Sequence, residues 1–142
     1  MPNNLTAIHT AVMSALDAAM PQPIVDQAVP DTETVVRNSA GAINPYIAIQ
    51  FGDLQEGYRH NMASVRYDDY YMPIYLQVIA PTPAITRAIY NKMIDTMLGL
   101  TTQWTGNIRK RPGGGMWPLV TSNGATEAYL FPCSFSLLIQ FE

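Results

Sequence analysis

Few residues of this sequence are of a type that could carry catalysis or bind a metal. The 142-residue chain contains two histidines, one cysteine and eleven acidic residues. His60 follows Asp53 and Glu56 at short range, but the spacing matches no established ligand pattern. We expect these three residues to be solvated side chains of an irregular segment. No metal site, cofactor site or catalytic carboxylate is predicted from them.

The remaining histidine and the cysteine have patterns typical of packed residues. His9 projects to the margin of the apolar side of an N-terminal helix, where a half-buried, hydrogen-bonded histidine is expected. Cys133 falls on the core side of an alternating C-terminal run, where burial raises the pKa of a thiol and keeps it unreactive. The sequence therefore predicts a protein that is not an enzyme.

Three adjacent cations, Arg109, Lys110 and Arg111, are followed by Pro112 and three glycines. This composition predicts a flexible basic loop over residues 103–117. Nucleotide binding is disfavoured, since no Gly-Lys-Ser/Thr sequence follows the glycines. The loop is either a plain solvated loop or a contact for a phosphate backbone or an acidic partner surface. In a ring of six subunits it would form a ring of charge around DNA.

The overall composition favours an oligomer with one domain over residues 1–142. Charged residues make up 13% of the chain, about half of the usual quarter, whereas Tyr, Met and Pro are plentiful. Cores of subunit interfaces are depleted of charge and enriched in Tyr and Met. The net charge of -3 argues against free nucleic acid as the primary partner. No run is apolar enough for a membrane span and no signal peptide is recognised, so synthesis in a cytoplasm is expected.

Two amphipathic helices are predicted. The first is capped by Asn3 or Asn4 and ends near Met20, before two prolines. The second begins after the cap Thr82 and runs over residues 83–98 to a stop at Gly99. Its apolar side is wide enough to cover a sheet and to contact a neighbouring subunit as well. That side contains Ile85, Ile89, Tyr90, Met93, Ile94, Met97, Leu98 and Leu100.

The remaining pattern is one of strands. A short edge strand is expected within residues 22–42, a half-buried strand at residues 46–51 and a further strand through residues 74–79. The polar residues 53–70 between the last two form either a hairpin arm or a functional loop, and we expect an extended arm. Asn123-Gly124 indicates a two-residue hairpin turn before the alternating C-terminal run, with a bulge or break expected at Pro132. The predicted fold is α+β, an antiparallel sheet of about four to five strands with both helices on one face.

Two groups of residues are candidates for a subunit interface. An acidic and aromatic patch before the 74–79 strand includes Tyr67, Tyr70 and Tyr71, and suits packing against another protein. The surplus apolar side of the second helix contributes Tyr90, Ile94 and Leu98.

The layout resembles that of the tail terminator, or tail completion, proteins of long-tailed bacteriophages, including the lambda-type terminator. The resemblance covers nearly the whole chain. It is carried by the N-terminal helix that ends at prolines, by residues 45–52 (PYIAIQFG), by the polar arm, by residues 74–80 (IYLQVIA), by residues 82–90 (TPAITRAIY) and by the alternating C-terminal strand.

The resemblance implies a structural virion protein, assembled in the host cytoplasm, that forms a hexameric ring at the head-proximal end of the tail. Such a ring stops polymerisation of the tail tube, joins the tail to the head connector or another neck protein, and allows genomic DNA through its lumen. A tail-tube, neck or connector subunit remains an alternative, as does a small ligand-binding or adaptor domain. From the residues alone, a free-standing dimer fits nearly as well as a ring.

Overall fold

The structure is a computed structural model that describes residues 5–26, 37, 39–53, 55–62, 65–100, 105–120 and 123–141. For residues 5, 55–62, 65–70, 105–107 and 138–141 it describes the backbone alone. The predicted caps Asn3 and Asn4 therefore lie outside the described residues, as do residues 27–36.

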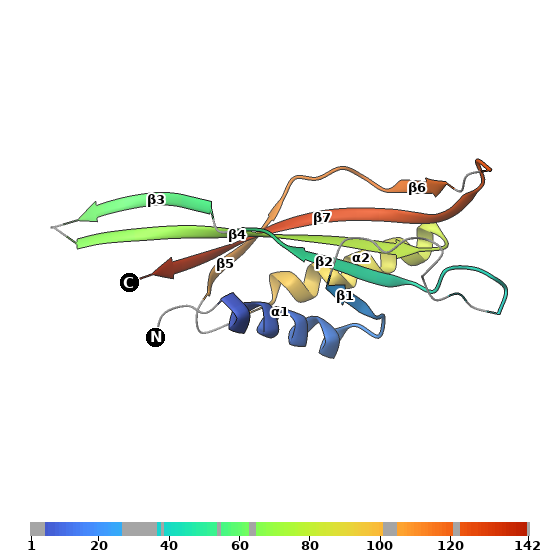
Figure 1. The fold of residues 1–142 in the computed structure, drawn as a ribbon, viewed down its shortest axis with the longest axis horizontal. Coiled ribbons are helices and arrows are strands. Elements are labelled where there is room, and N and C mark those ends of the chain that lie inside the picture. The colour runs from blue at the N-terminus through green and yellow to red at the C-terminus, as the bar shows by residue number, and fades with distance from the viewer. Residues whose placement is uncertain are drawn as a thin grey trace.

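The fold is α+β, with two helices on one face of a mixed, mostly antiparallel sheet (Figure 1). This confirms the predicted class and the predicted side of both helices. Its elements are α1 (Leu5–Ala19), β1 (Ile24–Asp26), β2 (Tyr46–Phe51), β3 (Gln55–Met62), β4 (Val65–Ala80), α2 (Pro83–Leu98), β5 (Thr105–Arg111), β6 (Trp117–Val120) and β7 (Thr126–Phe141).

The described sheet has seven strands, more than the four or five predicted, in the order β1-β2-β4-β7-β5. β4 and β7, with 16 residues each, form its centre. Each is long enough to pair with two strands on its outer side, so β3 follows β2 along β4 and β6 pairs with β7 beside β5. β1 pairs with β2 in parallel, whereas a purely antiparallel sheet was predicted.

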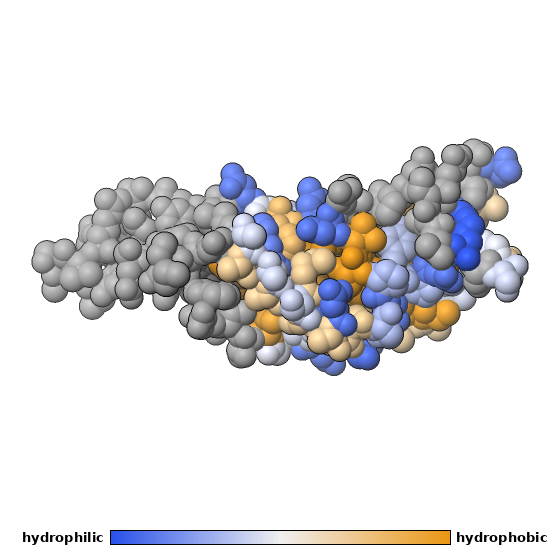
Figure 2. Space-filling model, turned by 60° about the horizontal axis from the view of Figure 1, so that its bottom comes forward, coloured by the Kyte–Doolittle hydropathy of each residue, from blue (hydrophilic) through white to orange (hydrophobic). Residues whose placement is uncertain are grey.

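The main core lies between the helices and the sheet. Ile47, Ile49 and Phe51 of β2 lie on one face, opposite Val78, Leu76 and Ile74 of β4, as the alternation predicts. The helices cover this face with the buried side chains Ile8, Val12, Leu16, Ile89, Met93 and Met97. Figure 2 views the molecule from the helix side and shows hydrophobic patches among hydrophilic surface.

A smaller core lies on the opposite face of the sheet, which we call the open face. It contains Ile43, Tyr46, Ala48, Ile79 and Ala128, all buried. β2 is thus buried on both faces at its start, whereas the sequence predicted a half-buried strand.

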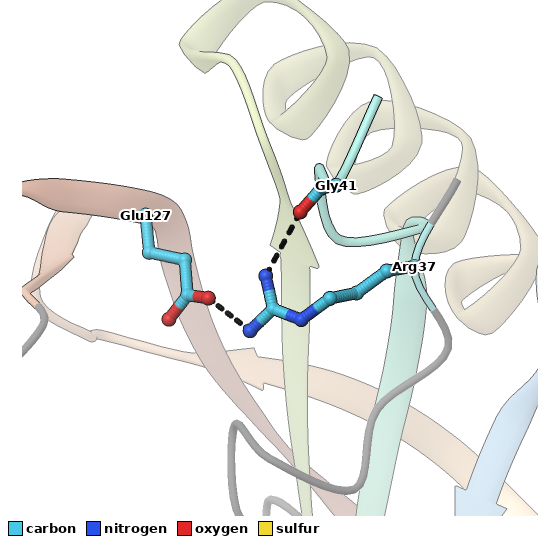
Figure 3. Close-up of polar contacts among 3 residues, drawn as sticks. All are labelled: Arg37, Gly41 and Glu127. Atoms are coloured by element: carbon cyan, nitrogen blue, oxygen red, sulfur yellow. Dashed lines mark hydrogen bonds and ion pairs between the residues drawn. The ribbon is translucent and has the colours of Figure 1, made fainter. Parts of the chain in front are cut away.

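An ion pair closes this second core. Arg37 binds Glu127 of β7 through Nη2 and donates from Nη1 to the backbone oxygen of Gly41, 3.0 Å away (Figure 3). Arg37 also forms an isolated antiparallel bridge with Ile43. The contacts fasten residues 39–43 to the end of the sheet.

Proline occurs in the middle of both central strands, where a missing N–H would normally break the hydrogen-bond ladder. In β4, the Pro73 oxygen accepts from the Gly52 nitrogen at 2.7 Å, so its backbone faces the β2 side. β2 ends opposite Ile74, and β3 begins opposite Tyr71. Pro73 therefore lies opposite the gap between the end of β2 and the start of β3, where neither strand requires a backbone N–H from it.

Pro132 is accommodated in the same way, and the predicted bulge or break at Pro132 is wrong. β7 runs without interruption from Thr126 to Phe141 and keeps a regular register with β4. On its other side, β6 reaches Leu130 and β5 reaches Ser134. The Pro132 oxygen points toward Gly113 in the segment that joins β5 and β6, so its nitrogen faces a gap between partners.

Both helices have the predicted faces, with exceptions at the two ends of α2. The side chain of Thr82 accepts from the Ile85 nitrogen at 3.3 Å, which confirms the cap of α2. Ile85 was placed on the apolar stripe, yet its side chain is 41% exposed because it lies in the first turn, at the end of the covered region. No helix in the described part of the chain is long and apolar enough to span a membrane.

Candidate interaction surfaces

The three adjacent cations do not lie in a flexible loop, and that prediction is wrong. Arg109, Lys110 and Arg111 form the end of β5 and pair with Ser136, Phe135 and Ser134 of β7. Only residues 112–116 between β5 and β6 are without regular structure. The basic residues are therefore held by a backbone ladder.

Strand geometry separates the three cations onto two faces. Paired residues share a face, and successive residues alternate. Lys110 is paired with Phe135 and so lies on the helix side at the sheet edge, where its charge lowers the pKa of Cys133 slightly against the effect of burial. Arg109 and Arg111 lie together on the open face.

A hydrogen bond orients Arg111 on that face. Its Nε donates to the hydroxyl of Ser136 at 2.8 Å. Ser136 is buried and directly opposite Arg109, so Arg111 leans diagonally toward its basic neighbour. Neither arginine forms an ion pair with any side chain that the structure describes.

The open face beside these arginines is not covered by a described helix. Register places Gln50, Tyr75, Ser134 and Arg111 in one row across β2, β4, β7 and β5, and Arg109 in the next row. Tyr75 is 44% exposed. We call these five residues the arginine face.

The predicted surplus of apolar surface on α2 is present only at the helix ends. Tyr90 stacks on Phe131 at a ring separation of 3.7 Å, and Ile94 is half-buried against the main core. Both are occupied within the chain. Leu98 is 52% exposed at the C-terminal end, and with Ile85 it is available for a contact.

β3 and the start of β4 form a hairpin in their backbone, as predicted for this segment, so the expectation that Glu56 and His60 lie in an irregular segment is wrong. β3 pairs with β4 from Gln55 opposite Tyr71 to Met62 opposite Val65. Tyr71 is half-buried. The side chains of Tyr67, Tyr70, Glu56 and His60 lie outside the described part, so their predicted roles stay predictions.

His9 and Cys133 have the environments expected of packed residues. His9 stacks on Phe51 with ring centroids 4.0 Å apart, and burial lowers its pKa although nearby Asp26 acts in the other direction. The expected hydrogen bond is absent at Nε2, which is buried without a partner in the described structure. Burial raises the pKa of Cys133 to about 12, which confirms the predicted direction.

The aromatic part of the open face was not predicted from the sequence. Tyr75 alternates with Ile74 and Leu76, which face the helices, but its exposure depends on which strands flank it. Trp117 of β6 is 59% exposed and pairs with Leu130. A tryptophan beside a Gly-rich segment, outside an alternating run, is the only signal for it in the sequence.

Among the described residues, no group of His, Cys, Asp and Glu is arranged to hold a metal ion. Comparison of the sequence with models of known protein families gives no match, and comparison with curated proteins gives none either.

Proposed function

We propose that the chain is a structural assembly protein, one subunit of a homo-oligomeric ring at the head-proximal end of a bacteriophage tail. The layout of its elements, which resembles that of tail terminators, supports the tail position. The projecting hairpin supports the oligomer.

The hairpin of β3 and the first half of β4 is the observation that carries the proposal. It extends beyond the part of the sheet that the helices cover (Figure 1). In the described structure β3 has β4 as its sole strand partner. β4 pairs with β7 as far as Asp68, so only the tip of the hairpin, where His60 lies opposite Tyr67 and Met62 opposite Val65, is a two-stranded ribbon. Such a ribbon is at best marginally stable in water unless it packs against something else. A neighbouring subunit would supply that packing.

The ends of α2 provide a second, smaller contact. Ile85 and Leu98 are exposed at opposite ends of a helix whose middle is buried against the main core. Apolar side chains at both ends favour contacts on two sides of the subunit. Contacts between two different surfaces of the same subunit generate a closed ring when the rotation between subunits closes.

Termination then follows from geometry without catalysis. One surface of such a ring matches the last ring of the tail tube, and the other matches the head connector. Growth by repeated head-to-tail addition stops because the second surface offers no site for another tube subunit.

Native mass spectrometry of the purified protein tests the proposal, with an expected mass near six subunits. A matched variant replaces residues 59–68 with Asn-Gly, which shortens the hairpin but leaves the register of β4 with β2 intact. We expect this variant to be folded by circular dichroism and a monomer by native mass spectrometry. A wild-type monomer at all concentrations would overturn the proposal, and long tubes in electron micrographs would favour a tail-tube subunit instead.

A further inference from the structure

We propose that the arginine face binds the phosphodiester backbone of nucleic acid through Arg109 and Arg111, which β5 and β7 hold side by side on the open face. This inference goes beyond the proposed ring and does not depend on it, since one subunit carries the whole face.

The first argument is the placement of two like charges without a counter-charge. Residues two apart on a strand are separated by about 6.8 Å, which is comparable to the distance between consecutive phosphates of one nucleic-acid strand. The Ser136 hydroxyl fixes Arg111 toward Arg109. Two neighbouring cations repel each other, so a phosphate between them lowers the energy of the pair.

The second argument is that acidic residues are absent from the two described rows that contain Arg109 and Arg111. Asp17 and Asp95 lie on the helices, Asp26 is paired with Ile49 of the helix side, and Glu127 binds Arg37. No other described Asp or Glu side chain occupies a row of the arginine face. The face is therefore locally positive although the chain carries a net charge of -3.

The third argument is the exposed aromatic ring in the same row. Ser134 lies between Tyr75 and Arg111 in this row. Because its side chain is small, it does not project between the tyrosine ring and the guanidinium group. Proteins that bind single-stranded nucleic acid combine a basic groove with aromatic rings on which bases stack. A duplex would instead use the arginines alone.

Fluorescence anisotropy with a short labelled oligonucleotide, single-stranded and duplex, tests the inference on the full chain. The double variant Arg109→Ala/Arg111→Ala should bind about tenfold more weakly at low salt. Its slope of log affinity against log salt should be smaller by about 0.9 for each lost duplex contact. Lys110→Ala is the control, because it removes one charge from the same strand but on the other face. We expect wild-type affinity from it.

A second pair of variants keeps the test valid if the double variant fails to fold. Gln50→Glu adds a negative charge to the exposed end of the row that contains Tyr75. Asn91→Asp makes the same chemical change at an exposed position of α2. Only Gln50→Glu should weaken binding. Loss of single-strand affinity in Tyr75→Ala supports single-stranded nucleic acid, and unchanged affinity supports the duplex. No binding by the wild type, or equal effects of the two charge-matched variants, would overturn the inference.

Discussion

Gly52, at the end of β2, lies so close to Pro73 of β4 that there is no room for a side chain. A Cβ atom built on Gly52 would lie 2.4 Å from Cγ of the Pro73 ring and 3.2 Å from its carbonyl oxygen. The ring is rigid and β4 is central, so neither can move away freely. The end of β2 therefore requires glycine because of this close approach.

We expect Gly52→Ala to lower the free energy of unfolding by about 1–3 kcal/mol, the usual cost of overpacking. Urea unfolding followed by circular dichroism measures it. Gly115→Ala is the matched control, since a Cβ there has no atom within 4 Å, and it should change stability by less than about 0.5 kcal/mol. Equal midpoints for the two variants would contradict the close approach.

Cys133 should make stability depend on pH in the alkaline range. Its folded-state pKa of about 12 lies above that of an exposed thiol, so as pH rises the unfolded chain loses the proton first. The free energy of unfolding should fall from about pH 9 toward pH 12 and be unaffected by this group at lower pH. Comparison with Cys133→Ala at several pH values isolates the contribution. A thiol reagent that labels native protein quickly at pH 8 would argue against burial.

The cap of α2 belongs to the scale of elements. Thr82 accepts from the Ile85 nitrogen, and its own carbonyl accepts from the hydroxyl of Thr86 at 2.8 Å. Thr82→Ala removes the first bond and leaves the second. We expect a loss of about 1 kcal/mol in urea unfolding, and near wild-type stability for Thr82→Ser. If Thr82→Ser were as unstable as Thr82→Ala, the cap would not be the cause.

Elements with a buried face could be predicted from the sequence. β2, the second half of β4 and the start of α2 follow their hydrophobic periods because one face of each contacts the main core. β5 was missed, since among its described side chains, those of residues 108–111, only Ile108 packs against that core. An edge strand with charges on both faces has no alternation to detect, and its partner β7 determines it instead.

The candidate site was predictable in its chemistry but not in its geometry. The residue types of the basic cluster allowed two readings, a plain solvated loop and a contact for an anionic partner. The sequence alone treats Arg109, Lys110 and Arg111 as equivalent, whereas pairing with β7 places only the two arginines together. Tyr75 joins them through β4, from a segment more than 30 residues earlier in the chain.

At the scale of the whole molecule, Arg37 and Glu127 connect positions 90 residues apart and hold the second core closed. We expect Glu127→Gln to lower stability by about 0.2–1 kcal/mol, since both side chains are partly exposed. The loss should shrink at high salt because screening weakens the pair in the wild type. Urea unfolding at two salt concentrations measures it. Asp17→Asn, an exposed change on α1, should show no such dependence.

The two central prolines have a consequence for how the sheet selects its pairing. A slip of β4 or β7 by one residue would turn the apolar side chains to the wrong face, but a slip by two would keep every side chain on its face. Hydrophobic alternation cannot reject that second error. Pro73 and Pro132 oppose this second error. A slip by two would move each proline from the gap between two outer strands to a position where a carbonyl of a partner strand needs an N–H. The prolines therefore favour the observed register of β4 with β2, and of β7 with β5 and β6.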